Sequence, residues 1–404
     1  MSRDGLPRPN AAALGAGYHS PDAVVAVRLN TNESAGPPPA AFREQLAEAV
    51  GHLGMNRYPD RRARALREAI GRHHGVGPER IFCANGSNEV LQCLMLAYGG
   101  PGRTALVFEP TYALHAHIAR LTGTSVVTGD RDGRFAVDPA AAAALLARVG
   151  AHSGQGEPIL TMLCSPNNPT GNAESRETVQ SLASAVPGLL VVDEAYGQFS
   201  PWSALELATA PPAAEGASGT TDAGRLSGDG GRYERVVVVV RTFSKTWAMA
   251  ALRLGYLVAE PGVVAACERV ALPYHLDAVK QAAGVLALRF EDEMRERTAG
   301  VVAERGRVEK GLSALGATVW PSDANFLLFQ LPGRASAEVW QALVERSVLV
   351  RDVSTWARLE GCLRVTVGTP AEDDSFLAAL DSFLQESASS AAAGESGTGS
   401  RLNT

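Results

Sequence analysis

A lysine that follows a run of five valines has neighbours suited to phosphate chemistry. The run 236–240 predicts a strand buried on both faces, and Lys245 lies just past its carboxyl end. Ligands bind beyond the carboxyl ends of the strands in an open α/β sheet, so this amine is expected to face a ligand. Ser244 and Arg253 could hold a phosphate beside it. For a lysine taken alone, a solvated loop position would be the alternative.

Other predicted strands also run into polar clusters at their carboxyl ends. Asn168, in the run Ser-Pro-Asn-Asn-Pro-Thr-Gly, follows one strand. Asp193 and Tyr196 follow the next strand, and Tyr112 follows a third. Because the carboxyl ends of parallel strands share one edge of the sheet, these side chains are expected to meet in one crevice with Lys245.

A polar segment at the start of a long apolar helix predicts an anion site. Ser87 and Asn88 follow a strand and a glycine turn, where exposed backbone N–H groups begin the helix. Simple N-capping is the alternative, and Ser87 alone would serve for that.

These residue types together suit pyridoxal 5′-phosphate. A lysine can form a Schiff base with it, and its ring is an electron sink for the charge left by a broken Cα–H bond. An aspartate keeps the pyridine nitrogen protonated, and a tyrosine and an asparagine at the phenolic oxygen lower the pKa of the imine. An aromatic ring stacks on the cofactor face, and the anion site takes the phosphate.

The sequence resembles the fold-type I, class I/II aminotransferases. The runs that carry this are Ser-Pro-Asn-Asn-Pro-Thr-Gly (165–171), Asp-Glu-Ala-Tyr (193–196) and Ser-Lys with an arginine eight residues on (244, 245, 253). Narrower runs are similar to the histidinol-phosphate aminotransferases, namely Leu-Asn-Thr-Asn-Glu (29–33), Arg-Tyr-Pro-Asp (57–60), Asn-Gly-Ser-Asn-Glu (85–89) and Leu-Arg-Val-Thr-Val-Gly-Thr (363–369). The resemblance covers roughly residues 18–384.

The resemblance implies a role for each residue at the cofactor ring. Lys245 forms the aldimine with the cofactor and is the base that moves the substrate proton from Cα to C4′. Asp193 pairs with the pyridine nitrogen. Tyr196 and Asn168 hold the phenolic oxygen, and Tyr112 stacks on the ring.

The resemblance also implies the anion contacts. The cofactor phosphate is bound by Ser87, Asn88, Ser244 and Arg253, joined by Tyr58 from a neighbouring subunit. That last contact implies a homodimer with shared active sites.

The remaining implied contacts are with the substrate. Arg364 clamps its carboxylate bidentately, a task that lysine performs poorly. Arg351 and Tyr18 face its side chain or phosphate, and Asn32 lies beside it.

The implied reaction moves an amino group between L-histidinol phosphate and 2-oxoglutarate. Residues 34 and 35 are Ser-Ala where the family has Asn-Pro, so an aminotransferase for an aromatic or other specialised biosynthetic amino acid stays open. A pyridoxal-phosphate decarboxylase of a phosphorylated amino acid also stays open. A non-catalytic ligand-sensing module would predict a DNA-binding segment or a lost lysine, and the sequence has neither.

Strands that alternate with helical stretches predict an α/β fold with a doubly wound parallel sheet. The resemblance implies the fold-type I architecture, in which a mainly parallel seven-stranded sheet lies between helices beside a smaller α/β domain. The expected divisions are an N-terminal arm (1–27), the small domain (28–54 and 272–385), the large cofactor domain (55–271) with a disordered insertion (208–231), and a disordered tail (386–404).

Composition narrows the choice of partners and location. The net charge of -6 argues against nucleic-acid and anionic-membrane partners and leaves small molecules, here an amino acid and a 2-oxo acid. The five scattered cysteines favour a reduced cytoplasmic setting, and no apolar run approaches membrane-spanning length. His115 and His117, two apart on a predicted helix, point in different directions, so no metal site is expected.

Overall fold

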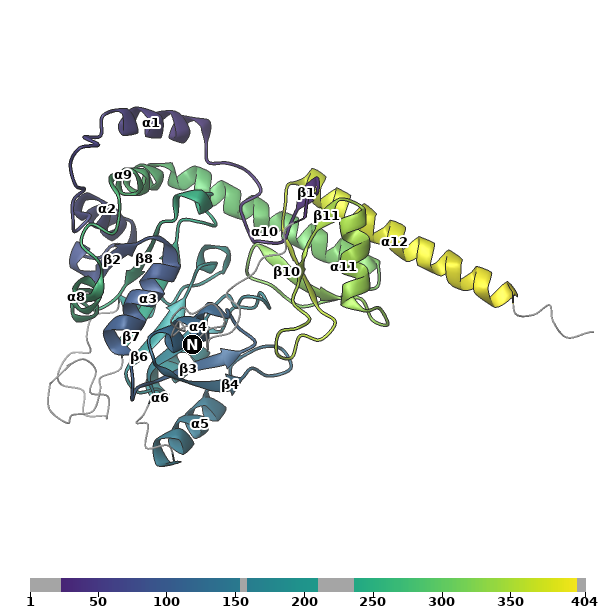
Figure 1. The fold of residues 1–404 in the computed structure, drawn as a ribbon, viewed down its shortest axis with the longest axis horizontal. Coiled ribbons are helices and arrows are strands. Elements are labelled where there is room, and N and C mark those ends of the chain that lie inside the picture. The colour runs from purple at the N-terminus through teal and green to yellow at the C-terminus, as the bar shows by residue number, and fades with distance from the viewer. Residues whose placement is uncertain (1–22, 153–157, 210–235, 398–404) are drawn as a thin grey trace, which may run out of the picture.

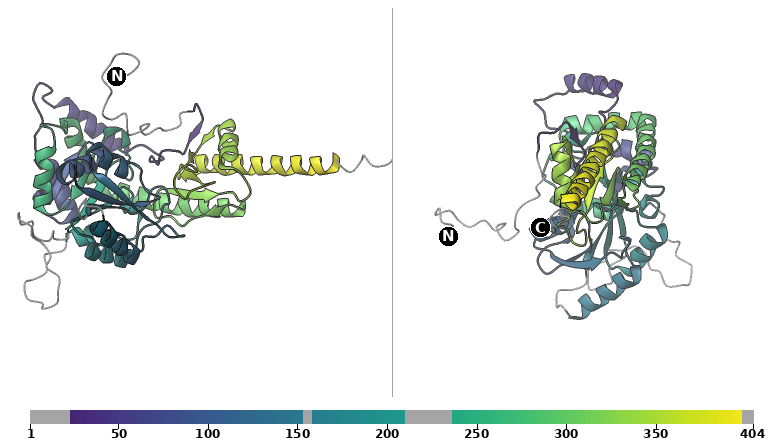
Figure 2. Two further views of the ribbon diagram at one scale, coloured as in Figure 1. Left: turned by 60° about the horizontal axis from the view of Figure 1, so that its bottom comes forward. Right: turned by 90° about the vertical axis from the view of Figure 1, so that its right-hand side faces the viewer.

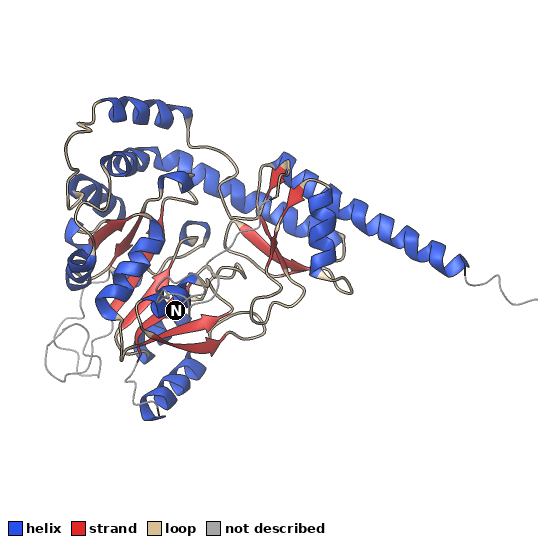
Figure 3. Ribbon diagram, in the orientation of Figure 1, coloured by secondary structure: helices blue, strands red, loops and turns tan. Residues whose placement is uncertain are grey.

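The fold is taken from a computed structural model that describes residues 23–152, 158–209 and 236–397. Its larger part is built on a seven-stranded sheet in the order β2-β8-β7-β6-β5-β3-β4 (Figures 1 and 3). The strands are β2 (Ile81–Ala84), β3 (Thr104–Glu109), β4 (Ser125–Asp130), β5 (Pro158–Cys164), β6 (Leu189–Asp193), β7 (Val236–Thr242) and β8 (Gly255–Val258). Strand β8 pairs antiparallel with β2 and β7, and the other described strands of this sheet pair in parallel. The prediction of a mainly parallel sheet is therefore confirmed.

Helices cover both faces of this sheet, which explains the run of valines. Val238 and Val240 pack into one apolar cluster, and Val239 packs into another on the opposite face. The first cluster is closed by α3 (Gly86–Tyr98), α4 (Leu114–Leu121) and α8 (Pro261–Val270). The second is closed by α5 (Pro139–His152), α6 (Arg176–Ala185) and α7 (Leu205–Ala208). A strand buried on both faces has no polar side to alternate with its apolar one.

The smaller part is an α/β unit, as predicted. An antiparallel sheet has the order β12-β13-β10-β9, and β1 pairs in parallel with β11. Its strands are β1 (Val27–Arg28), β9 (Thr318–Val319), β10 (Phe326–Gln330), β11 (Val348–Leu349), β12 (Arg351–Asp352) and β13 (Leu363–Thr366). Its helices are α11 (Ser336–Glu345) and α12 (Pro370–Gly397), and the long α10 (Glu291–Ala314) runs into it from the larger part (Figures 1 and 2).

Two helices of the segments predicted for the small domain (28–54 and 272–385) contact the larger part. They are α1 (Ala40–Gly51) and α9 (Ala278–Ala287), which pack with α2 (Arg64–His74) against the larger part. An amphipathic pattern shows that a helix has a buried face, but it does not say what covers that face.

Part of the segment predicted as a disordered tail is helical, and residues 398–404 lie outside the described residues. Helix α12 continues through Glu386 to Gly397, in keeping with the high helix propensity of its alanines. Most of the expected arm and insertion lies in residues 1–22 and 210–235, outside the described residues. No helix in the described part of the chain is long and apolar enough to cross a bilayer.

Candidate active site

A cavity of about 190 Å³ lies beyond the carboxyl ends of β5, β6 and β7, where the two parts meet. Twelve residues predicted for the site line it: Asn32, Ser87, Asn88, Tyr112, Asn168, Asp193, Tyr196, Ser244, Lys245, Arg253, Arg351 and Arg364. Five residues that the sequence did not single out also line it: Thr31, Cys164, Ala195, Thr242 and Trp356. The expected crevice therefore exists, and both parts contribute to it.

The amine of Lys245 is held by backbone carbonyl groups from the N-terminal segment. Its Nζ donates to the carbonyl oxygen of Asn32 at 2.7 Å and lies 3.3 Å from that of Thr31. Burial lowers the pKa of Lys245 to about 7, and the positive charges of Arg364 and Arg253 act in the same direction. Near neutral pH a large fraction of the amine is therefore uncharged and nucleophilic.

Asp193 is held by a histidine. It is the last residue of β6 and is buried; its Oδ1 accepts from the backbone N–H of Ala195 at 3.1 Å. Its Oδ2 lies 3.0 Å from Nε2 of His115, which is fully buried on α4. A carboxylate only accepts, so the imidazole donates. The sequence analysis treats His115 only as a candidate metal ligand. The one sequence signal for this contact is a histidine on a helix that is otherwise mostly apolar.

Asn32 connects the two parts of the molecule. Its Nδ2 donates to the Tyr196 hydroxyl at 2.9 Å, and its backbone N–H donates to Oγ1 of Thr366 at 2.9 Å. Its φ of 54° lies in the left-handed region, which asparagine tolerates better than most residues. Burial raises the pKa of Tyr196, so its hydroxyl stays protonated.

Two arginines of the smaller part face the cavity together. Arg364 on β13 and Arg351 on β12 are register partners, so their side chains lie on the same face of the sheet. The guanidinium of Arg364 donates to Oδ1 of Asn168 at 2.5 Å and to the carbonyl oxygen of Asn30 at 2.8 Å. Both arginines are buried, which makes them strong sites for small anions.

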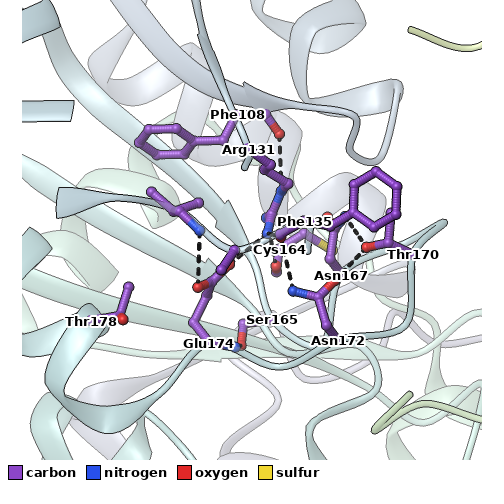
Figure 4. A network of polar contacts seen from close by, with 12 residues as sticks. Phe108, Arg131, Phe135, Cys164, Ser165, Asn167, Thr170, Asn172, Glu174 and Thr178 are labelled. Carbon is purple, nitrogen blue, oxygen red and sulfur yellow. Dashed lines mark hydrogen bonds and ion pairs between the residues drawn. The ribbon is translucent and has the colours of Figure 1, made fainter. Parts of the chain in front are cut away.

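The loop that carries Asn168 rests on a buried ion pair (Figure 4). The Arg131 guanidinium lies 2.5 Å from Oε1 of Glu174 and donates to the carbonyl oxygen of Cys164 at 3.1 Å. The backbone N–H of Glu174 donates to the Ser165 hydroxyl at 2.9 Å. Hydrogen bonds to Cys164 and Ser165 before the loop, and to Glu174 after it, hold both ends of the loop and thereby position Asn168.

An anion-binding corner forms where α3 begins. Ser87 and Asn88 lie in its first turn, and Nη1 of Arg253 donates to the Ser244 hydroxyl at 3.1 Å. A Cβ at Gly255 would lie 2.3 Å from the backbone nitrogen of Ser87, so only glycine allows this approach. Backbone N–H groups at a helix start together with a guanidinium suit a phosphate.

One described residue that was predicted for the site, Tyr58, does not line the cavity. Tyr58 is 80% exposed and stacks on Tyr274, with ring centroids 4.4 Å apart. Tyr18 lies outside the described residues. Among the residues that are described, no group of three or more His, Cys, Asp or Glu side chains could hold a metal ion.

Comparisons with known proteins agree with this geometry. The family model for aminotransferase class I and II matches residues 25–380. The chain is 43% identical to a histidinol-phosphate aminotransferase of Thermobifida fusca, over 94% of this chain and 96% of that protein. It is 40% identical to one of Corynebacterium diphtheriae, over 91% and 94%. It also shares its fold with the histidinol-phosphate aminotransferase from Sinorhizobium meliloti in complex with pyridoxal-5′-phosphate, with a TM-score of 0.73 at 24% identity, over 90% of this chain and 92% of that one.

Proposed function

We propose that this chain, which belongs to the class I and II aminotransferase family, transfers an amino group between L-histidinol phosphate and 2-oxoglutarate, with pyridoxal 5′-phosphate as its cofactor. The observation that carries the proposal is the placement of two buried arginines, Arg351 and Arg364, opposite each other at the cavity that contains Lys245 and Asp193. An enzyme that handles a phosphorylated amine and a dicarboxylate needs two anion sites beside its reactive amine.

The cavity residues fit the cofactor. Asp193 offers a carboxylate for a protonated pyridine nitrogen, and Tyr112 offers an aromatic face. The anion corner at Ser87 and Arg253 offers a phosphate site, and Gly255 keeps that corner open. When bound, pyridoxal 5′-phosphate supplies an aldehyde that reacts with amines and a ring that accepts the electron pair of the substrate Cα–H bond.

The chain's own residues then hold and move protons. Lys245, with its pKa lowered to about 7, would accept the Cα proton of the substrate and deliver it to the carbon of the cofactor aldehyde group. Tyr196 and Asn168 would donate hydrogen bonds to the phenolic oxygen of the cofactor, and Arg364 would bind the carboxylate of 2-oxoglutarate nearest the carbonyl carbon. Arg351 would bind the distal carboxylate. The phosphate is the one anion of the donor, and both arginines would share it.

The direct test measures turnover of purified enzyme with pyridoxal 5′-phosphate and 2-oxoglutarate, with L-histidinol phosphate or L-phenylalanine as the donor. We expect kcat/KM for L-histidinol phosphate to be at least about 100-fold higher, because its dianionic phosphate can engage both buried arginines, whereas the carboxylate of phenylalanine carries a single charge. Arg351→Gln should reduce that preference. A higher kcat/KM for phenylalanine would reject this substrate assignment and favour an aromatic aminotransferase.

The proposed enzyme is a homodimer with shared active sites. The stacked Tyr58 and Tyr274 rings lie at the surface next to exposed Met55 and Leu272, a grouping that suits an interface. In this arrangement Tyr58 reaches the cofactor phosphate of the other subunit. A mixture of inactive Tyr58→Ala and Lys245→Ala chains should then regain activity, because hybrid dimers contain one intact site. No regain after co-refolding would contradict the shared site.

We also propose a cytoplasmic location. All five cysteines lie in the described residues, buried and free. Burial raises the pKa of Cys83 and of Cys93 to about 12, which keeps these thiols unreactive. Free buried thiols suit a reducing compartment.

A further inference from the structure

Most of the cavity lining is polar, and its large aromatic residues come from different places. Tyr112 and Tyr196 belong to the larger part, and both hydroxyl groups are used in hydrogen bonds, to Asn88 and from Asn32. Trp356 comes from the smaller part, five residues after Arg351. Among the lining residues it belongs to the same part of the molecule as Arg351 and Arg364.

The loop that carries Trp356 is built to hold it in place. The backbone N–H of Trp356 donates to the carbonyl oxygen of Val353 at 3.0 Å, and its own carbonyl accepts from Leu359 at 3.1 Å. Val353 and Leu359 are fully buried in an apolar cluster with Phe135 and Leu328. The indole packs against this cluster and also lines the cavity.

A second anchor joins this loop to the larger part. Arg358, two residues after Trp356, donates through Nη1 to the carbonyl oxygen of Arg131. The same Nη1 lies 3.7 Å from Oδ1 of Asp130 on β4. The loop is thus anchored to both parts, and the indole packs on the apolar cluster before any ligand binds. A ligand that contacts the indole therefore loses little binding energy to ordering of the side chain.

The two proposed substrates differ most in their side chains. Both carry anions, so arginines alone separate them poorly. L-Histidinol phosphate also has an imidazole ring, whereas 2-oxoglutarate has an aliphatic chain that ends in a carboxylate. A flat aromatic surface favours an imidazole through stacking and, when the ring is protonated, through a cation–π interaction.

We propose that Trp356 is a specificity-determining residue: its indole binds the imidazole of the donor and makes no comparable contact with the acceptor. The inference rests on the proposed function and adds a substrate contact to it. In the donor half reaction Trp356 contacts the imidazole of L-histidinol phosphate. In the acceptor half reaction Arg351 contacts the distal carboxylate of 2-oxoglutarate.

The test compares Trp356→Leu and Trp356→Phe with a matched control, Trp320→Leu. Trp320 packs in the same apolar cluster, with its ring centroid 5.8 Å from that of Phe135, but it does not line the cavity. KM is measured for L-histidinol phosphate and for 2-oxoglutarate with each holoenzyme. We expect Trp356→Leu to raise the donor KM about 10-fold, and the acceptor KM less than about 2-fold.

Trp356→Phe keeps an aromatic surface and should recover most of the donor affinity, and Trp320→Leu should change neither KM. Equal rises in both KM values, or equal donor KM values for the Leu and Phe variants, would overturn the inference. If the Leu variant fails to fold, a donor KM for Trp356→Met at the wild-type value would overturn it as well. Absence of turnover of L-histidinol phosphate by the wild-type enzyme would instead reject the proposed function, independently of any Trp356 variant.

Discussion

The imidazole of His115 donates from Nε2 to Oδ2 of Asp193 over 3.0 Å, and neither side chain is open to solvent. This bond fixes the direction of the carboxylate, and a backbone N–H holds the other oxygen. In the proposed enzyme the carboxylate would face the pyridine nitrogen of the cofactor. His115 is therefore a positioning residue, although it does not line the cavity.

We expect His115→Phe to lower kcat by about 10- to 100-fold with little change in substrate KM. A hydrogen bond to a charged group is worth about 1.5–3 kcal/mol, and each ~1.4 kcal/mol is a factor of ten in rate. His115→Gln, which keeps a donor, should recover part of the loss. His117→Phe on the same helix is the control, and an equal loss there would show a general effect of disturbing α4.

The reactivity of Lys245 should titrate near neutral pH. Its pKa is lowered from 10.5 to about 7 by burial and by the positive charges of Arg364 and Arg253. In the cofactor-free protein, acetylation of Lys245 by acetic anhydride should therefore rise through pH 7 and level off above it, because only the neutral amine reacts. Peptide mass spectrometry measures the acetylated fraction of Lys245 at each pH.

Arg364→Gln removes one of these positive charges, so the midpoint for Lys245 should move to higher pH. A rate that still climbs steeply between pH 8 and pH 10 in the unmodified chain would contradict the lowered pKa.

Glu174→Gln should destabilise the fold strongly. It leaves the fully buried Arg131 guanidinium without its carboxylate, and breaking a buried pair from one side costs about 3–5 kcal/mol. Urea unfolding of the cofactor-free protein measures the change. Glu206→Gln, which breaks an exposed pair with Arg176 at 2.6 Å, is the control and should cost less than about 1 kcal/mol. Similar costs for both variants would refute the structural role of the buried pair.

Gly255→Ala should weaken cofactor binding. The added Cβ would lie 2.3 Å from the backbone nitrogen of Ser87 and 2.5 Å from the carbonyl carbon of Gly86, so the start of α3 must move. We expect the affinity for pyridoxal 5′-phosphate, titrated by its absorbance, to fall by at least about 10-fold, because the phosphate corner lies there.

Gly300→Ala is the matched control for that substitution. Gly300 lies inside α10, where a Cβ meets nothing within 4 Å. This variant should bind the cofactor normally and gain up to ~1 kcal/mol of stability from helix propensity. Normal cofactor affinity in Gly255→Ala would show that the corner does not depend on the close approach.

Much of the site was predictable because the apolar runs of strands and the polar residues at their ends are local features. The valine run and the residues after it predicted a buried strand followed by Lys245, and the same pattern located Asp193 and Asn168. Parallel strands bring their carboxyl ends to one edge, so these residues had to converge once the sheet was recognised.

Contacts between distant segments were not predictable in this way. The pairing of His115 with Asp193 spans 78 residues, and that of Arg364 with Asn168 spans 196. The place of Trp356 in the cavity depends on a loop with no regular period, held by Arg358 against the larger part.

The sequence alone therefore determined which segments are buried and which reactive side chains stand at strand ends, because periodicity and residue type record local burial. Only the tertiary structure decided which buried face covers which, as with α1 and α9 against the larger part. It also decided that His115 orients Asp193, and that burial, Arg364 and Arg253 lower the pKa of Lys245. These choices depend on packing and electrostatics between segments far apart in the chain, and no local pattern encodes them.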